Sequence, residues 1–239
     1  MATYLYCVRS DPVAPSHGLV GIDDARVRAL EVDDLLAWVS DVAVPSLDAS
    51  VDRVRAHDAV CAAALEDGDT PLPVRFGQTF ADDRDAVAGI ATRAAELRTR
   101  LARIAGCVEM RVVIARGRTD ASPAADDDGG TMRNDAAGED HPEGPGTAFL
   151  RRLARAGRAD LAREIGCEEV RHALRATAGS LVVEQHGCET ARGLAFFAVL
   201  VRRADASAFR RAVANTLPSQ AIDVAVLGPF APYTFSGDA

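Results

Sequence analysis

The chain has 239 residues, of which 48% are hydrophobic and 26% charged, which is typical of a soluble globular protein long enough to bury a sizeable core. Its formal net charge is -8, but eight acidic residues and two arginines between positions 118 and 146 account for six of those charges. The remainder is nearly neutral, which excludes the strongly basic surface of a nucleic-acid-binding protein.

The most apolar run, residues 193–201, is far short of the roughly 20 residues that a membrane-spanning helix needs. The first ten residues show no basic start followed by an apolar stretch, so no signal peptide is predicted. We therefore expect a cytoplasmic protein that does not act on a membrane.

Alternating apolar side chains in the first half predict strands at residues 3–9, 27–32, 35–42, 71–76 and 107–115. Asp33 and Asp34 separate the second and third of these strands, which predicts a tight hairpin. A helix is predicted at 51–67, and its expected buried face carries Val51, Val54, Cys61 and Leu65. A second helix is predicted at 82–104, and its acidic start favours the helix dipole.

Residues 118–146 contain no Val, Ile, Leu, Phe, Trp, Tyr or Cys, so they bury too little apolar surface to offset the entropy of folding. The run DDDGG within them suggests a calcium loop, but the spacing of an EF-hand is absent. We therefore predict a disordered acidic linker and no metal site. The chain then divides into an N-terminal domain (1–117), the linker (118–146) and a C-terminal domain (147–239).

The C-terminal domain is predicted to contain helices at 147–166, 168–178 and 205–217 and strands at 181–187, 194–203 and 221–227. The strand at 194–203 is apolar on both faces, which is typical of a central strand. Together the two halves predict an α+β protein with two ferredoxin-like α/β-sandwich domains, each an antiparallel sheet with helices on one face.

The sequence contains no nucleotide-binding, zinc-protease or hydrolase motif, and no cofactor is predicted. The five cysteines form no CxxC pair, so we expect buried, unreactive thiols. His57 and Cys61 lie one helical turn apart and could form a nucleophilic pair, although a histidine of the core with a satisfied hydrogen bond is the commoner arrangement. Arg75, in the stretch PLPVRFGQTF (71–80), suits an outward or interface position better than a catalytic one, since its neighbours are apolar.

Two stretches carry a resemblance to a known family. LPVRFGQTF (72–80), preceded by VRAHDAVCAAAL (54–65), and the terminal GPFAPYTF (228–235) resemble the signatures of the GvpF/GvpL family of gas vesicle proteins. The opening TYLYCV and the segment TAFLRR, which follows the linker, are similar to other parts of that family. The resemblance covers nearly all of the chain except the linker.

The resemblance implies two ferredoxin-like domains, no catalytic activity and a role in assembling gas vesicles, the hollow protein shells that give cells buoyancy. It also implies contact with the small, very hydrophobic major shell protein, GvpA, and with other gas vesicle accessory proteins. Sheet edges could accept a strand of the shell protein, or an apolar groove could accept one of its helices. The candidate partner-binding residues are Arg75, Phe76, Phe230, Tyr233 and Phe235.

Three alternatives stay open at this point. The aromatic residues of the tail could instead fold back and close the space between the domains. The protein could be a small-molecule-binding module or enzyme on paired ferredoxin-like domains, for which His57, Arg75 and Glu109 are the candidate polar groups. It could also be a structural protein that remains in the mature vesicle.

Overall fold

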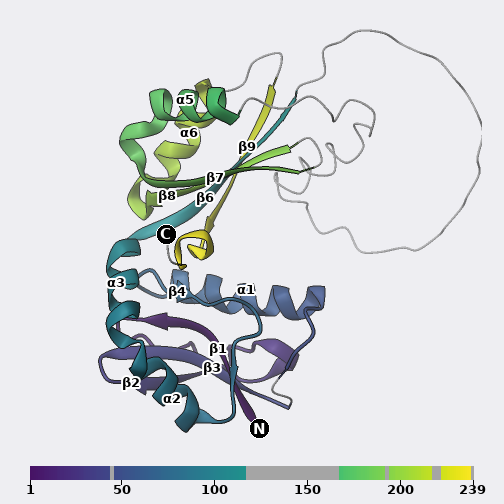
Figure 1. Cartoon of the computed structure of the whole chain (residues 1–239), viewed down its shortest axis with the longest axis vertical. Helices are drawn as coiled ribbons and strands as arrows, with labels where there is room; N and C mark the ends of the chain where they lie inside the picture. Colours follow the sequence, from purple (N-terminus) through teal and green to yellow (C-terminus); the bar gives the residue numbers. More distant parts are fainter. Residues whose placement is uncertain (44–45, 117–166, 192–193, 217–221, 238–239) are drawn as a thin grey trace, which may run out of the picture.

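In the computed structural model, Figure 1 shows two antiparallel sheets with helices packed against each. The structure describes residues 1–43, 46–116, 167–191, 194–216 and 222–237. The predicted acidic linker (118–146) and the predicted helix at 147–166 lie outside the described residues, so the predicted division of the chain into domains stays a prediction.

The first sheet contains β1 (Ala2–Arg9), β2 (Arg28–Val32), β3 (Leu35–Val42), β4 (Leu72–Pro73) and β5 (Thr79–Phe80). The strands lie in the order β2-β3-β1-β4, with β5 also paired to β1, and all pairings are antiparallel. The predicted hairpin between β2 and β3 is confirmed. Its turn places Asp33 at a φ of 54°, in the left-handed region that aspartate tolerates better than most residues.

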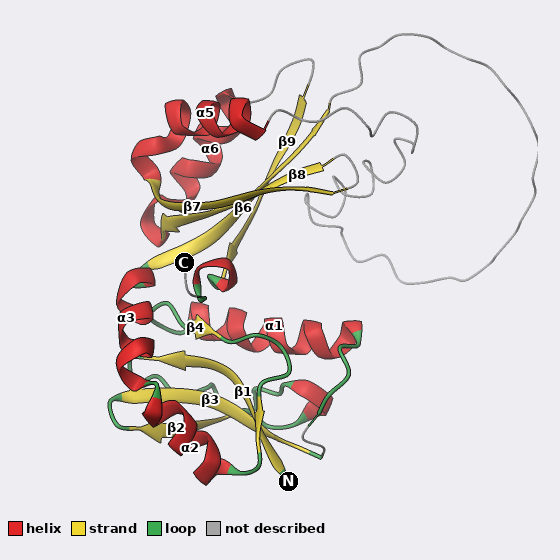
Figure 2. Cartoon of the chain, viewed as in Figure 1, coloured by secondary structure: helices red, strands yellow, loops and turns green. Residues whose placement is uncertain are grey.

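Helices cover both faces of the first sheet: α1 (Val51–Glu66) lies on one face, and α2 (Asp83–Thr92) and α3 (Ala94–Ile104) lie on the other (Figure 2). Every residue of β1 is buried, which is the pattern of a strand covered from both sides. Tyr4 and Tyr6 of β1 pack toward α1, whereas Leu5 and Val8 pack toward α2 and α3.

The predicted helix at 51–67 is confirmed, and the Ser50 side chain caps it by accepting a hydrogen bond from the Arg53 backbone N–H. Its predicted buried face is wrong in the first turn, because Val51 is 65% and Val54 42% exposed. The buried face begins at His57: His57, Val60, Cys61 and Ala64 face the first sheet, while Leu65 joins the core cluster of the second sheet.

The single helix predicted at 82–104 is in fact two helices, α2 and α3, which meet at Arg93. Arg93 has φ -104° and ψ 8°, outside the helical range. The apolar stripe nevertheless continues across the break at helical spacing, and its buried residues are Ala86, Ile90, Ala94, Leu97, Leu101 and Ile104. The sequence pattern alone therefore does not reveal the bend.

The strand predicted at 107–115 exists as β6 (Cys107–Arg116), but its expected place in the first sheet is wrong. β6 pairs with β8 (Leu194–Arg202) and β9 (Ile222–Phe230) in the second sheet. The edge of β1 is already occupied by β4 and β5, and the turn at Gly106, with a φ of 67°, leads β6 away from the first sheet.

The second sheet has the order β7-β8-β6-β9, where β7 spans Val182–Ala191, so the predicted inner position of β8 is confirmed. The helices α5 (Cys167–Ala178) and α6 (Ala206–Thr216) cover one face. Leu174 of α5 and Phe209 of α6 pack there against Met110, Phe197 and other inward side chains of the strands.

We call the first sheet with α1, α2 and α3 the first half of the molecule, and the second sheet with α5 and α6 the second half. The face of the second sheet opposite α5 and α6 contacts the first half at one end. Cys107 and Leu200 share a core cluster with Leu97 and Leu101 of α3, so the two halves are joined by a continuous apolar core. The short 3-10 helix η4 (Tyr233–Phe235) lies between the two sheets in Figure 1. The predicted fold class, an α+β protein built on two antiparallel sheets, is confirmed. The expected helices on one face are found at the second sheet, whereas the first sheet has helices on both faces.

Candidate functional site

The stretch 71–80 forms two short strands joined by a loop instead of the single strand predicted at 71–76. Its backbone stays attached to β1, because the Val74 N–H donates to the Tyr6 carbonyl and the Leu5 N–H donates to the Gln78 carbonyl, both at 3.0 Å. Between these bonds the chain turns at Gly77, with a φ of 92° that favours glycine. The loop therefore projects from the sheet at a fixed place.

A groove of about 490 Å³ lies beside this loop. Its walls come from β1, the 72–80 stretch, α2, α3 and the end of the tail, and the apolar lining residues are Leu5, Val8, Leu72, Pro73, Val74, Phe80, Ile90 and Leu97. Three arginines also line it, Arg75, Arg93 and Arg100, and none of the lining residues is acidic. An apolar floor with a cationic border can hold a partner segment of matching chemistry.

One wall of the groove is formed where the Phe80 ring packs against Gly89, in the middle of α2. A Cβ atom at this position would come within 2.8 Å of the Phe80 ring. Glycine weakens a helix interior, so its presence here has a packing reason: it lets the half-buried Phe80 lie against the helix.

Of the five candidate residues named from the sequence, only Arg75 lines the groove, and the four aromatic residues lie elsewhere. Arg75 is exposed and lines the groove. Phe76 packs against Tyr4 and His57, with ring centroids 6.0 Å apart in both pairs, and the three tail residues lie at the junction of the halves. The residues are therefore not one contiguous surface.

The aromatic tail holds the two halves together. Phe235 is 1% exposed and belongs to the core cluster that both halves share, and Tyr233 packs near His57 at 6.1 Å between ring centroids. Phe230 lies under the Arg111 guanidinium at 5.4 Å from its ring centroid. The arrangement matches the alternative in which the tail folds back between the domains.

Glu109 anchors this tail. The side chain is fully buried on β6, and its carboxylate accepts hydrogen bonds from the Thr234 N–H at 2.8 Å, the Thr234 hydroxyl at 3.1 Å and Arg111 Nε at 2.9 Å. Arg100 of α3 donates to the Ser236 carbonyl at 2.9 Å, and Arg103 donates to the Phe235 carbonyl. The sequence pointed to Glu109 only as a possible catalytic group, whereas the structure uses it to hold the chain end.

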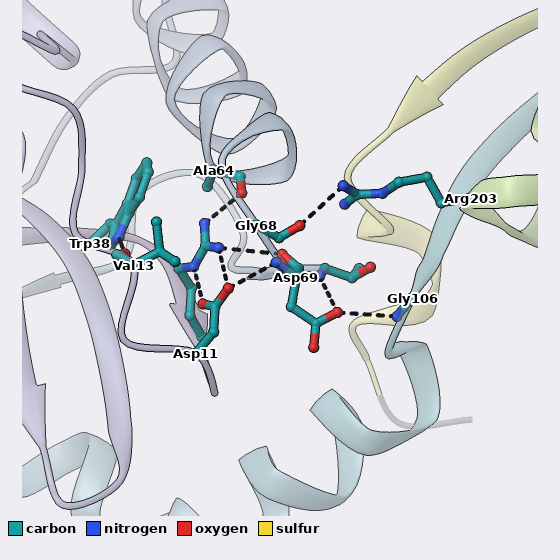
Figure 3. Close-up of polar contacts among 10 residues, drawn as sticks. Asp11, Val13, Trp38, Ala64, Gly68, Asp69, Gly106 and Arg203 are labelled. Carbon is teal, nitrogen blue, oxygen red and sulfur yellow. Dashed lines mark hydrogen bonds and ion pairs between the residues drawn. The ribbon is translucent and has the colours of Figure 1, made fainter.

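A second polar cluster joins the halves on the other side of the junction (Figure 3). Arg9 is 1% exposed and forms a two-point ion pair with Asp11 at 2.6 and 2.7 Å, while also donating to the Ala64 carbonyl at the end of α1. The Asp69 N–H donates to Asp11 at 2.8 Å, and the Asp69 carboxylate accepts from the Gly106 N–H at 3.2 Å. Sequence patterns gave no signal for this cluster, because a buried arginine at a strand end resembles an exposed one.

Two further hydrogen bonds cross from the first half to the second in this region. Arg203, which follows β8, donates to the Gly68 carbonyl at 3.0 Å, and the Thr70 hydroxyl donates to the Cys107 carbonyl at 2.7 Å. Polar contacts and apolar packing thus both connect the halves.

The Arg9–Asp11 pair makes stability depend on pH. Hydrogen bonds from Arg9 hold the pKa of Asp11 below its usual range, so the pair contributes its full stability above about pH 4 and loses it as the pH falls through the folded-state pKa. The difference in unfolding free energy between the wild type and Asp11→Asn should therefore be largest at neutral pH and shrink below about pH 4. Urea denaturation at several pH values measures it, and a difference that does not change with pH would contradict the assignment.

His57 and Cys61 are close but lack the geometry of a nucleophile and its base. The Val74 carbonyl can only accept, so the His57 Nε2 that contacts it is the donor, and Nδ1 accepts from the Tyr4 hydroxyl at 2.9 Å, which itself accepts from the Gly77 N–H. His57 Nε2 then carries the proton and donates to the Val74 carbonyl at 3.1 Å, while Cys61 Sγ lies 3.8 Å from the same nitrogen. Because this nitrogen is a donor, it cannot take the thiol proton, and both side chains are buried.

Among the described residues, no three histidine, cysteine or acidic side chains gather as a metal site would require. Across the same ranges no helix is long and apolar enough to span a membrane.

The chain is similar to known proteins over nearly its whole length. The family model described as "Gas vesicle synthesis protein GvpL/GvpF" matches residues 2–237. Gas vesicle protein L2 of Halobacterium salinarum is 30% identical, with 98% of this chain and 91% of that protein covered, and gas vesicle protein L1 of the same organism is 24% identical, with 98% and 90% covered.

Two solved structures share the fold. The crystal structure of GvpF from Anabaena superposes with a TM-score of 0.70 at 19% identity and covers 100% of this chain and 99% of that one. GvpF from Microcystis aeruginosa gives a TM-score of 0.69 at 18% identity, with 99% of each chain covered.

Proposed function

The chain belongs to the GvpL/GvpF family of gas vesicle synthesis proteins, and from this premise we propose that it is a non-enzymatic assembly factor that binds the major shell protein, GvpA. The resemblance noted in the sequence is confirmed at the level of the family. Binding to GvpA is the step that we add.

The observation that carries the proposal is the groove beside the 72–80 stretch. A protein that tiles the wall of a gas-filled shell exposes apolar surface before assembly, and such surface aggregates unless a soluble partner covers it. The groove offers apolar side chains from a sheet and two helices, and the family signature RFG (75–77) forms the loop at its edge. We place the GvpA contact there.

The arrangement of polar groups favours binding over catalysis. The three residues named for an enzymatic alternative do not converge: His57 is hydrogen-bonded within the core, Glu109 holds the tail, and Arg75 lies at the groove. An active site needs such groups around one reacting atom.

The proposal also includes the cellular setting. We place the protein in the cytoplasm, associated with gas vesicles, with GvpA and other gas vesicle accessory proteins as partners and with neither nucleic acid nor membrane as a partner. Of the candidate contact residues, Arg75 is the one that lines the groove, while Phe76, Phe230, Tyr233 and Phe235 support the fold around it.

Phe80→Ala tests the groove in a pull-down of tagged GvpA co-expressed with this protein. Removing an aromatic wall at the centre of an interface weakens binding by about 2 kcal/mol or more, or roughly thirtyfold. Val183→Ala is the matched control, since Val183 is an exposed apolar residue on β7 away from the groove. Equal capture by wild type, Phe80→Ala and Val183→Ala would count against the groove, and no capture by any of them would count against GvpA as the partner.

A further inference from the structure

The groove carries a charge pattern that apolar contact alone does not explain. Its lining includes three arginines and no aspartate or glutamate, although the whole chain has a net charge of -8. Arginine is the side chain best suited to pair with a carboxylate, because its planar fork donates two parallel hydrogen bonds. The groove is therefore bordered by cationic side chains, with no acidic residue in its lining, although the protein as a whole is acidic.

Arg75 is placed to contact a partner. It is exposed, and within the described ranges it forms no hydrogen bond or ion pair with another residue. The backbone that carries it is fixed on both sides, by the bond from the Val74 N–H to Tyr6 and by the bond from the Gly77 N–H to the Tyr4 hydroxyl at 3.0 Å. The side chain of Arg75 therefore extends from a well-anchored backbone segment at the edge of the apolar floor.

Arg93, at the junction of α2 and α3, and Arg100 of α3 also border the groove. Each forms an ion pair with Glu96, which is not among the lining residues, and Arg100 also donates to the Ser236 carbonyl. These contacts hold both arginines in fixed directions next to the groove. Arg75 has no such acceptor among the described residues, so a purely apolar partner would remove water from its guanidinium without supplying one, which is unfavourable.

We infer that the groove selects a partner segment in which carboxylates border the apolar side chains, and that Arg75 is the residue that determines this selectivity. The inference rests on the proposed function, since it specifies the chemistry of the segment that occupies the same groove. The apolar floor provides burial, while the arginines favour an acidic segment and reject a basic one by like-charge repulsion.

Fluorescence anisotropy with labelled peptides and the full-length protein tests the inference. The probes are amphipathic peptides of about 15 residues with leucines at helical spacing, bordered by glutamate in the first, glutamine in the second and lysine in the third. The glutamate peptide should bind at least about tenfold more tightly than the glutamine peptide, and the lysine peptide should be weaker still. The preference should decrease at high salt.

Arg75→Gln should reduce the preference for glutamate over glutamine to within about threefold, because the carboxylate loses its two-point partner. Arg98→Gln is the matched control, since Arg98 is an exposed arginine of α3 that pairs with Asp34 and does not line the groove. It should keep the full preference. Circular dichroism confirms that both variants are folded.

Equal affinity for the glutamate and glutamine peptides would overturn the inference, and so would a preference that survives Arg75→Gln. A stable dimer that Arg75→Gln dissociates would overturn it too, because a second copy of the chain would then be the occupant. These results can be told apart from a failure of the proposed function. The proposed function is tested separately, by whether GvpA is captured in the pull-down and whether Phe80→Ala weakens that capture.

Discussion

Replacing Phe235 with alanine should lower the free energy of unfolding by about 3–5 kcal/mol, the usual loss for a large aromatic side chain removed from a core. Phe235 is 1% exposed and packs among residues of both halves, including Leu97 of α3 and Leu200 of β8. The cavity cannot collapse easily, because Glu109, Arg100 and Arg103 hold the backbone around it.

Chemical denaturation of the purified protein measures this loss, and Phe230→Ala is the control from the same tail. Phe230 is only half-buried and contacts Arg111 through its ring face, so its removal should cost about 1 kcal/mol. Similar losses for the two variants would mean that the tail is not part of the shared core.

Replacing Asp11 with asparagine should lower the free energy of unfolding by about 3 kcal/mol at neutral pH, because it leaves Arg9 as a buried charge without its partner. Arg9 is 1% exposed, and Asp11 supplies two of its hydrogen bonds, at 2.6 and 2.7 Å, as well as the acceptor for the Asp69 N–H. The change should therefore also loosen the turn at residues 68–70, whose hydrogen bonds reach the second half.

Asp23→Asn is the matched control for this prediction. Asp23 forms a two-point pair with Arg53, with both distances at 2.9 Å, but its side chain is 49% exposed. An exposed pair is screened by water, so its loss should destabilise the protein far less than the loss of Asp11, and asparagine keeps the left-handed backbone that Asp23 adopts. Equal losses for Asp11→Asn and Asp23→Asn would show that burial of Arg9 does not matter.

Much of the fold could be predicted from local sequence patterns. The hairpin at Asp33, the inner strand β8 and the helices α1, α5 and α6 follow from periodicity and turn residues, which act over a few positions. The place of β6 could not be predicted in this way. Its alternation shows that it is a strand, but which sheet it joins depends on an edge that residues 72–80 already occupy.

The candidate site was predicted only in part, for a similar reason. Arg75 was singled out by its apolar neighbours, and it does line the groove. The pattern in 107–115 placed Glu109 opposite the apolar face of its strand, which usually means exposure to water. Only the folded chain shows that the tail covers this position, more than a hundred residues later in the sequence.

The most direct test of the central claim is site-specific photo-crosslinking during co-expression with GvpA. A photoreactive residue in place of Gln78, an exposed position in the groove, is compared with the same residue in place of Val183 on β7. If the groove binds the shell protein, mass spectrometry will find a covalent adduct with GvpA at position 78 and none at position 183. Adducts at both positions in equal amounts, or at position 183 alone, would contradict binding in the groove.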